Sequence, residues 1–288
     1  MTDAANASRL IVAGGGRLRM PRLGLGTWPM TGTVCEEAVL SALSLGYRHI
    51  DTAEAYGNED AIGSALARSE LARSELHITT KVWWDHLQPD AMRAAIDRSL
   101  EALRTDYVDL YLIHWPGKEW DPAAAMEALV GFQQAGLARA VGVANFPLAL
   151  LRRTVEEWRV PVACVQVEYH VLLGQSALLR YARAHDMAFT AYTPLGRGAA
   201  LELPEVRAIA ARHGATPSQV ALAWLVGQDG VAAVPKAAGE ANQLANLQAL
   251  GLELTDEDRA VIASLPKNRR MISPDFAPEW DPPEADTR

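Results

Sequence analysis

The stretch "YRHIDTAEAYGNE" (47–59) holds the pattern that decides the fold: a short apolar run ends in an acid, Asp51, and a helix-like segment follows. Short apolar runs of this kind are typical of parallel strands buried on both faces. Eight such runs alternate with helix-like segments, at 22–28, 47–52, 76–82, 109–115, 139–145, 163–170, 188–195 and 231–237. Eight β/α units predict an α/β protein with a (β/α)8 TIM barrel.

The segments between these runs carry helix signals. Residues 90–106 have apolar side chains at helical spacing, and 216–226 opens with Thr216 as a cap and a proline at the first helical position. A doubly wound sheet is the alternative fold, but no GxGxxG opens a helix after the first run. The alternation therefore favours the barrel.

The two ends of the chain carry different signals. "GGGRLRM" (14–20) follows the short run "RLIVA" (9–13), which predicts an N-terminal β-hairpin that closes the barrel bottom. The end, from about 270 to 288, is rich in proline and is expected to be a loop or a disordered tail. Because no linker divides the chain, residues 1–288 are expected to form a single domain.

Composition narrows the class of protein. The chain has 288 residues, 49% of them hydrophobic, and a net charge of −8, which argues against nucleic acid or an anionic membrane as the main partner. No signal-like start and no apolar stretch of about 18 residues is present, so we expect a cytoplasmic protein. Cys35 and Cys164 lack CxxC spacing and are expected to be buried, reduced thiols.

Polar residues close the predicted strands. In a barrel of this class, active sites lie at the carboxyl ends of the strands. The residues at these ends are Asp51, Lys81, His114 with Trp115, Asn145, Gln166 with Glu168 and His170, Tyr192 with Thr193, and Lys236. Each has a structural alternative, since Asp51 could cap a helix, Tyr56 could pack, and His114 could be a core histidine. Their convergence on one barrel mouth favours a functional site.

An acid, a tyrosine, a lysine and a histidine together suit carbonyl reduction. The carbonyl oxygen must gain a proton as hydride reaches its carbon, and Tyr56 can supply one. A tyrosine has a reference pKa of about 10, which the ammonium of Lys81 would lower. Asp51 would keep that lysine charged, and His114 would orient the substrate oxygen. The tryptophans that follow three strand ends could wall the pocket: Trp28, Trp83 and Trp115.

A series of motifs in the chain resembles the aldo-keto reductase family. They are "GLGTW" (24–28), "DTAEAYGNE" (51–59), "ITTKVW" (78–83), "LIHWP" (112–116), "GVANF" (142–146), "QVEYH" (166–170), "YTPLGRG" (192–198) and "VPKA" (234–237). They follow the family's order over nearly the whole chain. The end, "RRMISPDFAPEWD" (269–281), is similar to the B-type bacterial 2,5-diketo-gluconate reductase branch, which also reduces methylglyoxal and β-keto esters.

The resemblance implies a barrel that reduces aldehydes or ketones with a nicotinamide cofactor and no metal, as a monomer. The family's catalytic tetrad falls on Asp51, Tyr56, Lys81 and His114. Its cofactor contacts fall on Thr27, Asp51, Asn145, Gln166, Tyr192, Thr193, Leu195, Gly196, Lys236 and Asn246. Its specificity loops fall on 117–124, 197–204 and 268–282.

The chain departs from the family at two cofactor positions. Ala144 replaces the usual serine before the asparagine, so one hydrogen bond to the carboxamide should be absent. The family's 2′-phosphate clamp is a lysine with an arginine six residues later, and here Lys236 is followed by Asn242. We expect NADPH to remain the first cofactor, because Lys236 survives and Arg197 could assist. NADH should also be usable.

Two other functions are open to the same barrel. The first is a metal-dependent hydrolase or lyase that uses His49, Asp51, His114, Glu168 and His170, although no HxH or HExxH motif occurs. The second is a cofactor-binding subunit without turnover. The filled tetrad favours catalysis over both.

Overall fold

The structure, a computed structural model, describes residues 10–282 and forms the expected barrel. Eight parallel strands make one sheet in chain order. They are β3 (Leu25–Gly26), β4 (His49–Asp51), β5 (His77–Val82), β6 (Val108–Ile113), β7 (Ala138–Ala144), β8 (Val162–Glu168), β9 (Ala188–Tyr192) and β10 (Val231–Ala233). Parallel bridges from Leu23 to Ala233 and from Gly26 to Lys236 close the sheet between β10 and β3.

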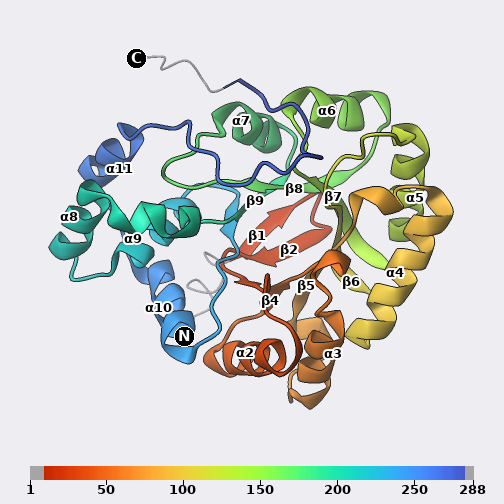
Figure 1. Cartoon of the computed structure of the whole chain (residues 1–288), viewed down its shortest axis with the longest axis horizontal. Helices are drawn as coiled ribbons and strands as arrows, with labels where there is room; N and C mark the ends of the chain where they lie inside the picture. The colour runs from red at the N-terminus through yellow and green to blue at the C-terminus, as the bar shows by residue number, and fades with distance from the viewer. Residues whose placement is uncertain (1–9, 283–288) are drawn as a thin grey trace.

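Helices surround the sheet (Figure 1). They are α2 (Gly32–Leu45), α3 (Glu59–Arg68), α4 (Pro89–Leu103), α5 (Pro122–Gln134), α6 (Leu148–Arg152), α7 (Ser176–Ala184), α8 (Pro204–Arg212), α9 (Pro217–Val226), α10 (Glu240–Gln248) and α11 (Asp256–Ala263). The cap at Thr216 is confirmed, because its hydroxyl accepts from the backbone N–H of Gln219. The helix expected over 90–106 ends at Leu103, because Arg104 takes a left-handed conformation with φ 54°.

The N-terminal hairpin closes one end of the barrel, as expected. Its strands are β1 (Leu10–Ala13) and β2 (Leu18–Pro21), paired antiparallel. Asp186, beyond α7, accepts from the backbone N–H groups of Gly14 and Gly15, both at 2.7 Å. Gly14 has φ 62°, and a Cβ there would lie 2.8 Å from the Cβ of Ala163, so only glycine fits this close approach.

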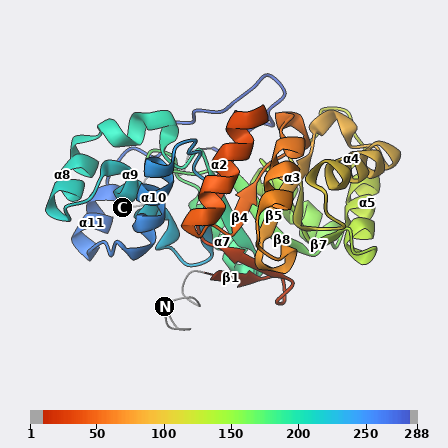
Figure 2. The same ribbon diagram turned by 90° about the horizontal axis from the view of Figure 1, so that it is seen from below.

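Two apolar clusters contain side chains of the barrel strands, and a third joins α8, α9 and α11. Of the two barrel clusters, the larger lies between the outer face of the sheet and the helices. The smaller fills the barrel interior, where hairpin side chains meet short side chains of the strands: Ile11, Ala13, Leu18, Met20, Leu110, Leu112, Ala140, Ala144, Ala163, Cys164, Ala188 and Ala232. The barrel interior is therefore filled by packed side chains. The segment after α11 arches over the end of the barrel opposite β1 (Figure 2).

Three short helices shape the loops at that open end. They are η1 (Glu54–Tyr56) after β4, η3 (Trp84–His86) after β5 and η5 (Gly196–Glu202) after β9. The strands themselves are shorter than the predicted runs. Several of the polar residues assigned to strand ends, such as His114 and Asn145, therefore lie just beyond the last strand residue, at the rim.

Candidate active site

A cavity of about 1190 Å³ lies at the carboxyl ends of the strands. It is lined by residues that the sequence predicts at this mouth, all but one of them polar or aromatic: Thr27, Trp28, Asp51, Tyr56, Trp83, His114, Trp115, Asn145, Gln166, Tyr192, Thr193, Leu195 and Lys236. Its volume lies somewhat above the range of roughly 300–1,000 Å³ that is typical of ligand sites. Residues from many separate strand ends thus meet in one place.

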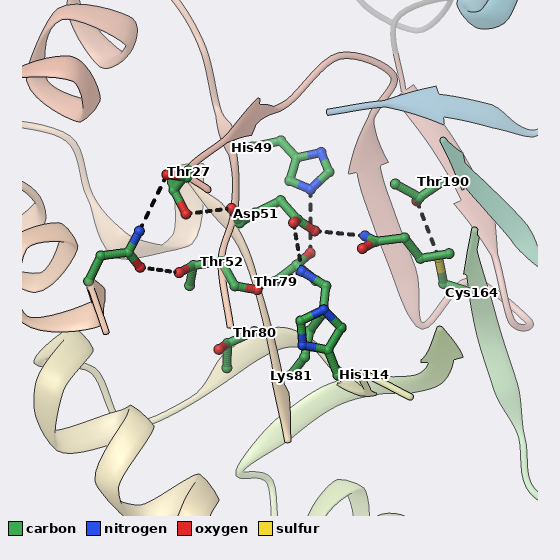
Figure 3. A network of polar contacts seen from close by, with 12 residues as sticks. Thr27, His49, Asp51, Thr52, Thr79, Thr80, Lys81, His114, Cys164 and Thr190 are labelled. Atoms are coloured by element: carbon green, nitrogen blue, oxygen red, sulfur yellow. Dashed lines mark hydrogen bonds and ion pairs between the residues drawn. The ribbon is translucent and has the colours of Figure 1, made fainter. Parts of the chain in front are cut away.

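A buried ion pair lies beneath the cavity. The Nζ atom of Lys81, at the end of β5, lies 2.6 Å from Oδ1 of Asp51, at the end of β4, and donates to the backbone oxygen of Thr52 at 2.6 Å (Figure 3). The second carboxylate oxygen of Asp51 accepts from Nε2 of Gln166 at 2.7 Å. The Asp51 side chain caps no helix, since the residue before η1 is Ala53. A charged pair this deeply buried needs such complete partnering to be tolerated.

Tyr56 lies over this pair on the short helix η1. The ammonium of Lys81 is 5.3 Å from the centroid of its ring. The ring also meets Trp28 at a centroid distance of 5.3 Å and His114 at 5.5 Å. Gly57 ends η1 in a left-handed conformation with φ 60°, which turns the chain into α3 and keeps the tyrosine at the rim.

The environment of Tyr56 corrects one sequence-based expectation. Burial, with a smaller contribution from the Asp51 carboxylate, raises the pKa of the Tyr56 hydroxyl, whereas we expected Lys81 to lower it. The main cause is the burial of the tyrosine, and the Asp51 carboxylate, which is paired with Lys81, adds to it. Tyr56 is therefore a neutral hydroxyl donor throughout the physiological pH range.

His114 is neutral as well. Burial, aided by the charge of Lys81, holds the pKa of its imidazole well below the usual value. Its Nδ1 atom is buried and has no hydrogen-bond partner among the described residues. Its backbone oxygen accepts from Nδ2 of Asn145 at 3.0 Å, and the Oδ1 atom of Asn145 accepts from the hydroxyl of Tyr192 at 2.7 Å. A chain of polar contacts thus connects the ends of β6, β7 and β9.

The residues expected to hold a cofactor divide into two groups. Seven of them line the cavity besides Asp51: Thr27, Asn145, Gln166, Tyr192, Thr193, Leu195 and Lys236. Gly196 is buried just behind the lining with φ 55°, and Asn246 is buried on α10, outside the lining. The cavity therefore offers amide groups, the ring of Tyr192 and two exposed cations, Lys236 and Arg197, which together fit a nicotinamide dinucleotide.

Sequence reasoning missed several residues of the outer cavity. Met271, Ile272 and Phe276 line it from the C-terminal loop, and Glu54 and His86 line it from η1 and η3. The resemblance indicates the loop at 268–282 only as a region, and no residue of 117–124, another predicted specificity loop, is part of the lining. Motifs near the strand ends do not indicate that a loop from the C-terminal part of the chain lines the same cavity.

The polar residues around Tyr56 also proved to have structural roles. Glu54 accepts from the backbone N–H of Trp83 at 2.5 Å and lies 3.1 Å from Nδ1 of His86, which connects η1 to η3. Asn58 accepts from the hydroxyl of Thr52 at 2.7 Å. These contacts fix the loop that carries Tyr56, a role that the sequence had not indicated for Asn58.

The residues considered as metal ligands do not assemble into one site. Within residues 10–282 no three His, Cys, Asp or Glu side chains are placed to share an ion. Asp51 pairs with Lys81, and His49 lies 3.3 Å from the backbone oxygen of Pro21, on the hairpin side. In the same part of the chain, no helix is both long and apolar enough to cross a bilayer.

Fold and site together define an oxidoreductase barrel, and comparison with known proteins agrees. The aldo/keto reductase family matches residues 22–267. Methylglyoxal reductase DkgB of Escherichia coli O157:H7 is 40% identical over 92% of this chain and 100% of its own length, and DkgB of Yersinia pestis is 39% identical over the same shares. The chain belongs to the aldo/keto reductase family, whose members reduce carbonyl compounds with NAD(P)H.

Solved structures support the same assignment. A protein assigned as a 2,5-diketo-D-gluconic acid reductase B superposes with a TM-score of 0.90 and 38% identity, over 96% of this chain and 100% of its own. The aldose reductase of Schistosoma japonicum superposes with a TM-score of 0.87 and 30% identity, over 94% and 98% of the two chains. The barrel and its hairpin are thus those of the family.

Proposed function

We propose that the protein reduces small aldehydes and ketones to alcohols, with Tyr56 as the proton donor and NADPH as the preferred source of hydride. The observation that carries this proposal is the buried Lys81–Asp51 pair beneath a cavity-lining tyrosine. Replacing a buried ion pair with hydrophobic residues of similar volume is often neutral or stabilising. Packing alone therefore does not explain the pair, which favours a role in the reaction.

The reaction needs a hydride at the carbonyl carbon and a proton at its oxygen. When bound, the reduced nicotinamide supplies the hydride. The hydroxyl of Tyr56 gives its proton to the oxygen, and the alkoxide that develops there is a stronger base than phenolate, so the transfer is favourable even from a tyrosine of raised pKa. Solvent then returns a proton to the tyrosine.

Each of the other tetrad residues supports that transfer. Lys81, held charged by Asp51, stabilises the phenolate that forms on Tyr56, from a distance of 5.3 Å to the ring. The neutral imidazole of His114 lines the cavity and can hydrogen-bond the substrate oxygen without competing for the proton. Gln166 and Asn145, fixed by their own hydrogen bonds, would hold the carboxamide of the cofactor, and Tyr192 would stack on its ring.

The substrate class follows from the walls and the relatives. The outer cavity is aromatic, with Trp28, Trp83, Trp115 and Phe276 around the tyrosine. Among the relatives named above, DkgB is a methylglyoxal reductase and one solved structure is assigned as a 2,5-diketo-D-gluconic acid reductase B. We therefore propose methylglyoxal, β-keto esters and 2,5-diketo-gluconate as the substrates to test first, with the loop at 268–282 as the main determinant of choice.

The cofactor choice rests on the exposed cations of the cavity. Lys236 and Arg197 both line it, whereas position 242, on the exposed part of α10, is an asparagine. One charge-assisted hydrogen bond is worth about 1.5–3 kcal/mol, or roughly 10- to 150-fold in affinity. NADPH therefore ranks first, with NADH usable to an unusual degree.

The test is an initial-rate panel of methylglyoxal, β-keto esters, aromatic aldehydes and diketo-gluconate with each cofactor. Carbonyl-dependent oxidation of NADPH that chelators do not affect would support the proposal. Quenching of protein fluorescence by NADPH, with no oxidation for any carbonyl, would instead identify a non-catalytic cofactor-binding protein.

A further inference from the structure

A buried carboxylate outside the tetrad holds part of the cavity wall. Glu168 is the last residue of β8, and its side chain is fully buried. Its Oε1 atom accepts from the backbone N–H of Met271 at 2.6 Å, and its Oε2 atom accepts from that of Ile272 at 2.8 Å. Nε2 of His170 lies 2.9 Å from Oε1. The Glu168 carboxylate thus accepts hydrogen bonds from two consecutive backbone amides of a loop about one hundred residues away in sequence.

Those amides belong to a segment, residues 269–281, that we call the C-terminal strap. At its start, the backbone N–H of Arg269 donates to the oxygen of Leu172 at 2.9 Å. At its end, Asp281 accepts from the backbone N–H of Leu148 at 2.8 Å, at the first residue of α6. The strap therefore runs across the barrel mouth between two fixed points, which agrees with its course in Figure 2.

The strap forms the outer wall of the cavity. Met271, Ile272 and Phe276 all line it. The ring of Phe276 meets Trp83 at a centroid distance of 5.3 Å and Trp115 at 5.5 Å, both edge to face. Edge-to-face aromatic pairs of this kind favour one geometry. The residues fixed by Glu168 are therefore four and five positions from the side chain that completes the aromatic wall.

We propose that Glu168 is a positioning residue for substrate, which holds the C-terminal strap in the geometry that completes the outer cavity. Its position gives it this role, because side chains two residues apart on a strand lie on the same face, and Gln166 supports Asp51 from the same strand end. The end of β8 thus organises both the inner site and the outer wall. The inference rests on the proposed function only for the part that concerns substrate.

The carboxylate is well suited to the task. Its two oxygens accept from two consecutive backbone N–H groups, and charge-assisted hydrogen bonds of this kind are about twice as strong as neutral ones. Glutamine has the same shape but would turn one N–H₂ group toward a backbone N–H. The bonds go to the backbone, so they fix the course of the strap whatever its side chains are.

The first test compares Glu168→Gln with Glu279→Gln, a matched change at an exposed position of the same strap. For Glu168→Gln we expect KM for an aromatic aldehyde to rise roughly tenfold, as the loss of one charge-assisted bond implies. The dissociation constant for NADPH and kcat should each stay within about threefold, because Tyr56 and Lys81 are untouched. Glu279→Gln should match the wild type in all three quantities.

The strap can also be tested without turnover. Cleavage by trypsin after Arg269 or Arg270, followed by mass spectrometry, should be faster in Glu168→Gln than in Glu279→Gln. In the wild-type protein, the amide hydrogens of Met271 and Ile272 should exchange at least about tenfold more slowly than that of Asp275, because both are bonded to a buried group. This measurement holds even if the variant does not fold or if the protein reduces no carbonyl in the panel.

Two results would overturn the role of Glu168. One is equal exchange of the Met271, Ile272 and Asp275 amides in the wild type. The other is a folded Glu168→Gln variant whose KM is unchanged. A variant with lower kcat and weaker NADPH binding, but with the same KM and the same rate of strap cleavage, would also overturn it. A lack of carbonyl reduction by the wild type, with slow exchange retained, would refute the proposed function and leave the strap contact standing.

Discussion

The Nζ atom of Lys81 lies 2.6 Å from a carboxylate oxygen of Asp51, and the two side chains are 0% and 4% exposed. This pair joins the ends of adjacent strands and lies under the ring of Tyr56. Burial, with a smaller contribution from the Asp51 carboxylate, raises the pKa of Tyr56, so the tyrosine is protonated in the resting protein. The ammonium of Lys81 lies 5.3 Å from the centre of its ring, close enough to stabilise a phenolate that forms there.

Breaking the pair should be costly. Asp51→Asn leaves the ammonium of Lys81 buried without its counter-charge, and loss of one partner of a buried pair costs about 3–5 kcal/mol. We expect that loss in the free energy of unfolding from urea denaturation, together with a large fall in kcat. Glu157→Gln, which removes one partner of the exposed pair with Arg153, should cost less than about 1 kcal/mol. Equal effects of the two changes would contradict the role of the buried pair.

The turnover number should vary little with pH around neutrality. Burial lowers the pKa of His114 well below 6.5 and raises that of Tyr56 above 10.0. Neither group then changes its protonation between those values, so kcat for reduction at saturating substrate should be flat there. A contrary result would be a fall in kcat at alkaline pH with an apparent pKa near neutrality, present in the wild type and absent in Tyr56→Phe. It would show that Tyr56 loses its proton in the range where we expect none to be lost.

Stability should fall on mild acidification. Burial lowers the pKa values of His49 and His77, whose rings meet at 4.7 Å at the hairpin end of the barrel. Below about pH 6.5 the unfolded chain therefore binds more protons than the folded one. The free energy of unfolding then falls as pH decreases, by up to about 1.4 kcal/mol per pH unit for each histidine. Urea midpoints between pH 8 and 5 test this, and a constant midpoint would count against it.

The cofactor preference should respond to a single change. Asn242→Arg restores the second cation of the 2′-phosphate clamp, so kcat/KM with NADPH relative to NADH should rise roughly 10- to 150-fold. In the wild type the NADPH advantage should stay below about a thousandfold. A larger advantage in the wild type, or no response to the new arginine, would refute the weakened clamp. Asn242→Gln is the matched uncharged control.

Much of this architecture could be predicted from local sequence. The eight apolar runs, the glycine turn of the hairpin and the cap at Thr216 are short-range signals, and the structure confirms them. The gathering of Asp51, Lys81 and His114 also followed, because parallel strands in a barrel end at one mouth.

The remaining features depend on contacts that no local pattern encodes. Glu168 was considered as a metal ligand, yet it binds backbone amides of the strap, which have no sequence signature. The sequence predicts a lowered pKa for Tyr56, because it places Lys81 nearby but does not show how deeply the tyrosine is buried. The tail was expected to be a loop or disordered, and up to residue 282 it is a loop held by Glu168 and Asp281.

The most direct test of the central claim compares the wild type with Tyr56→Phe in the carbonyl-dependent oxidation of NADPH. Phenylalanine keeps the ring contacts with Trp28 and His114 but has no proton to give. We predict that turnover falls at least about 100-fold, in line with the loss of a general acid, while the dissociation constant for NADPH changes little. Wild-type turnover in the Tyr56→Phe protein would contradict it.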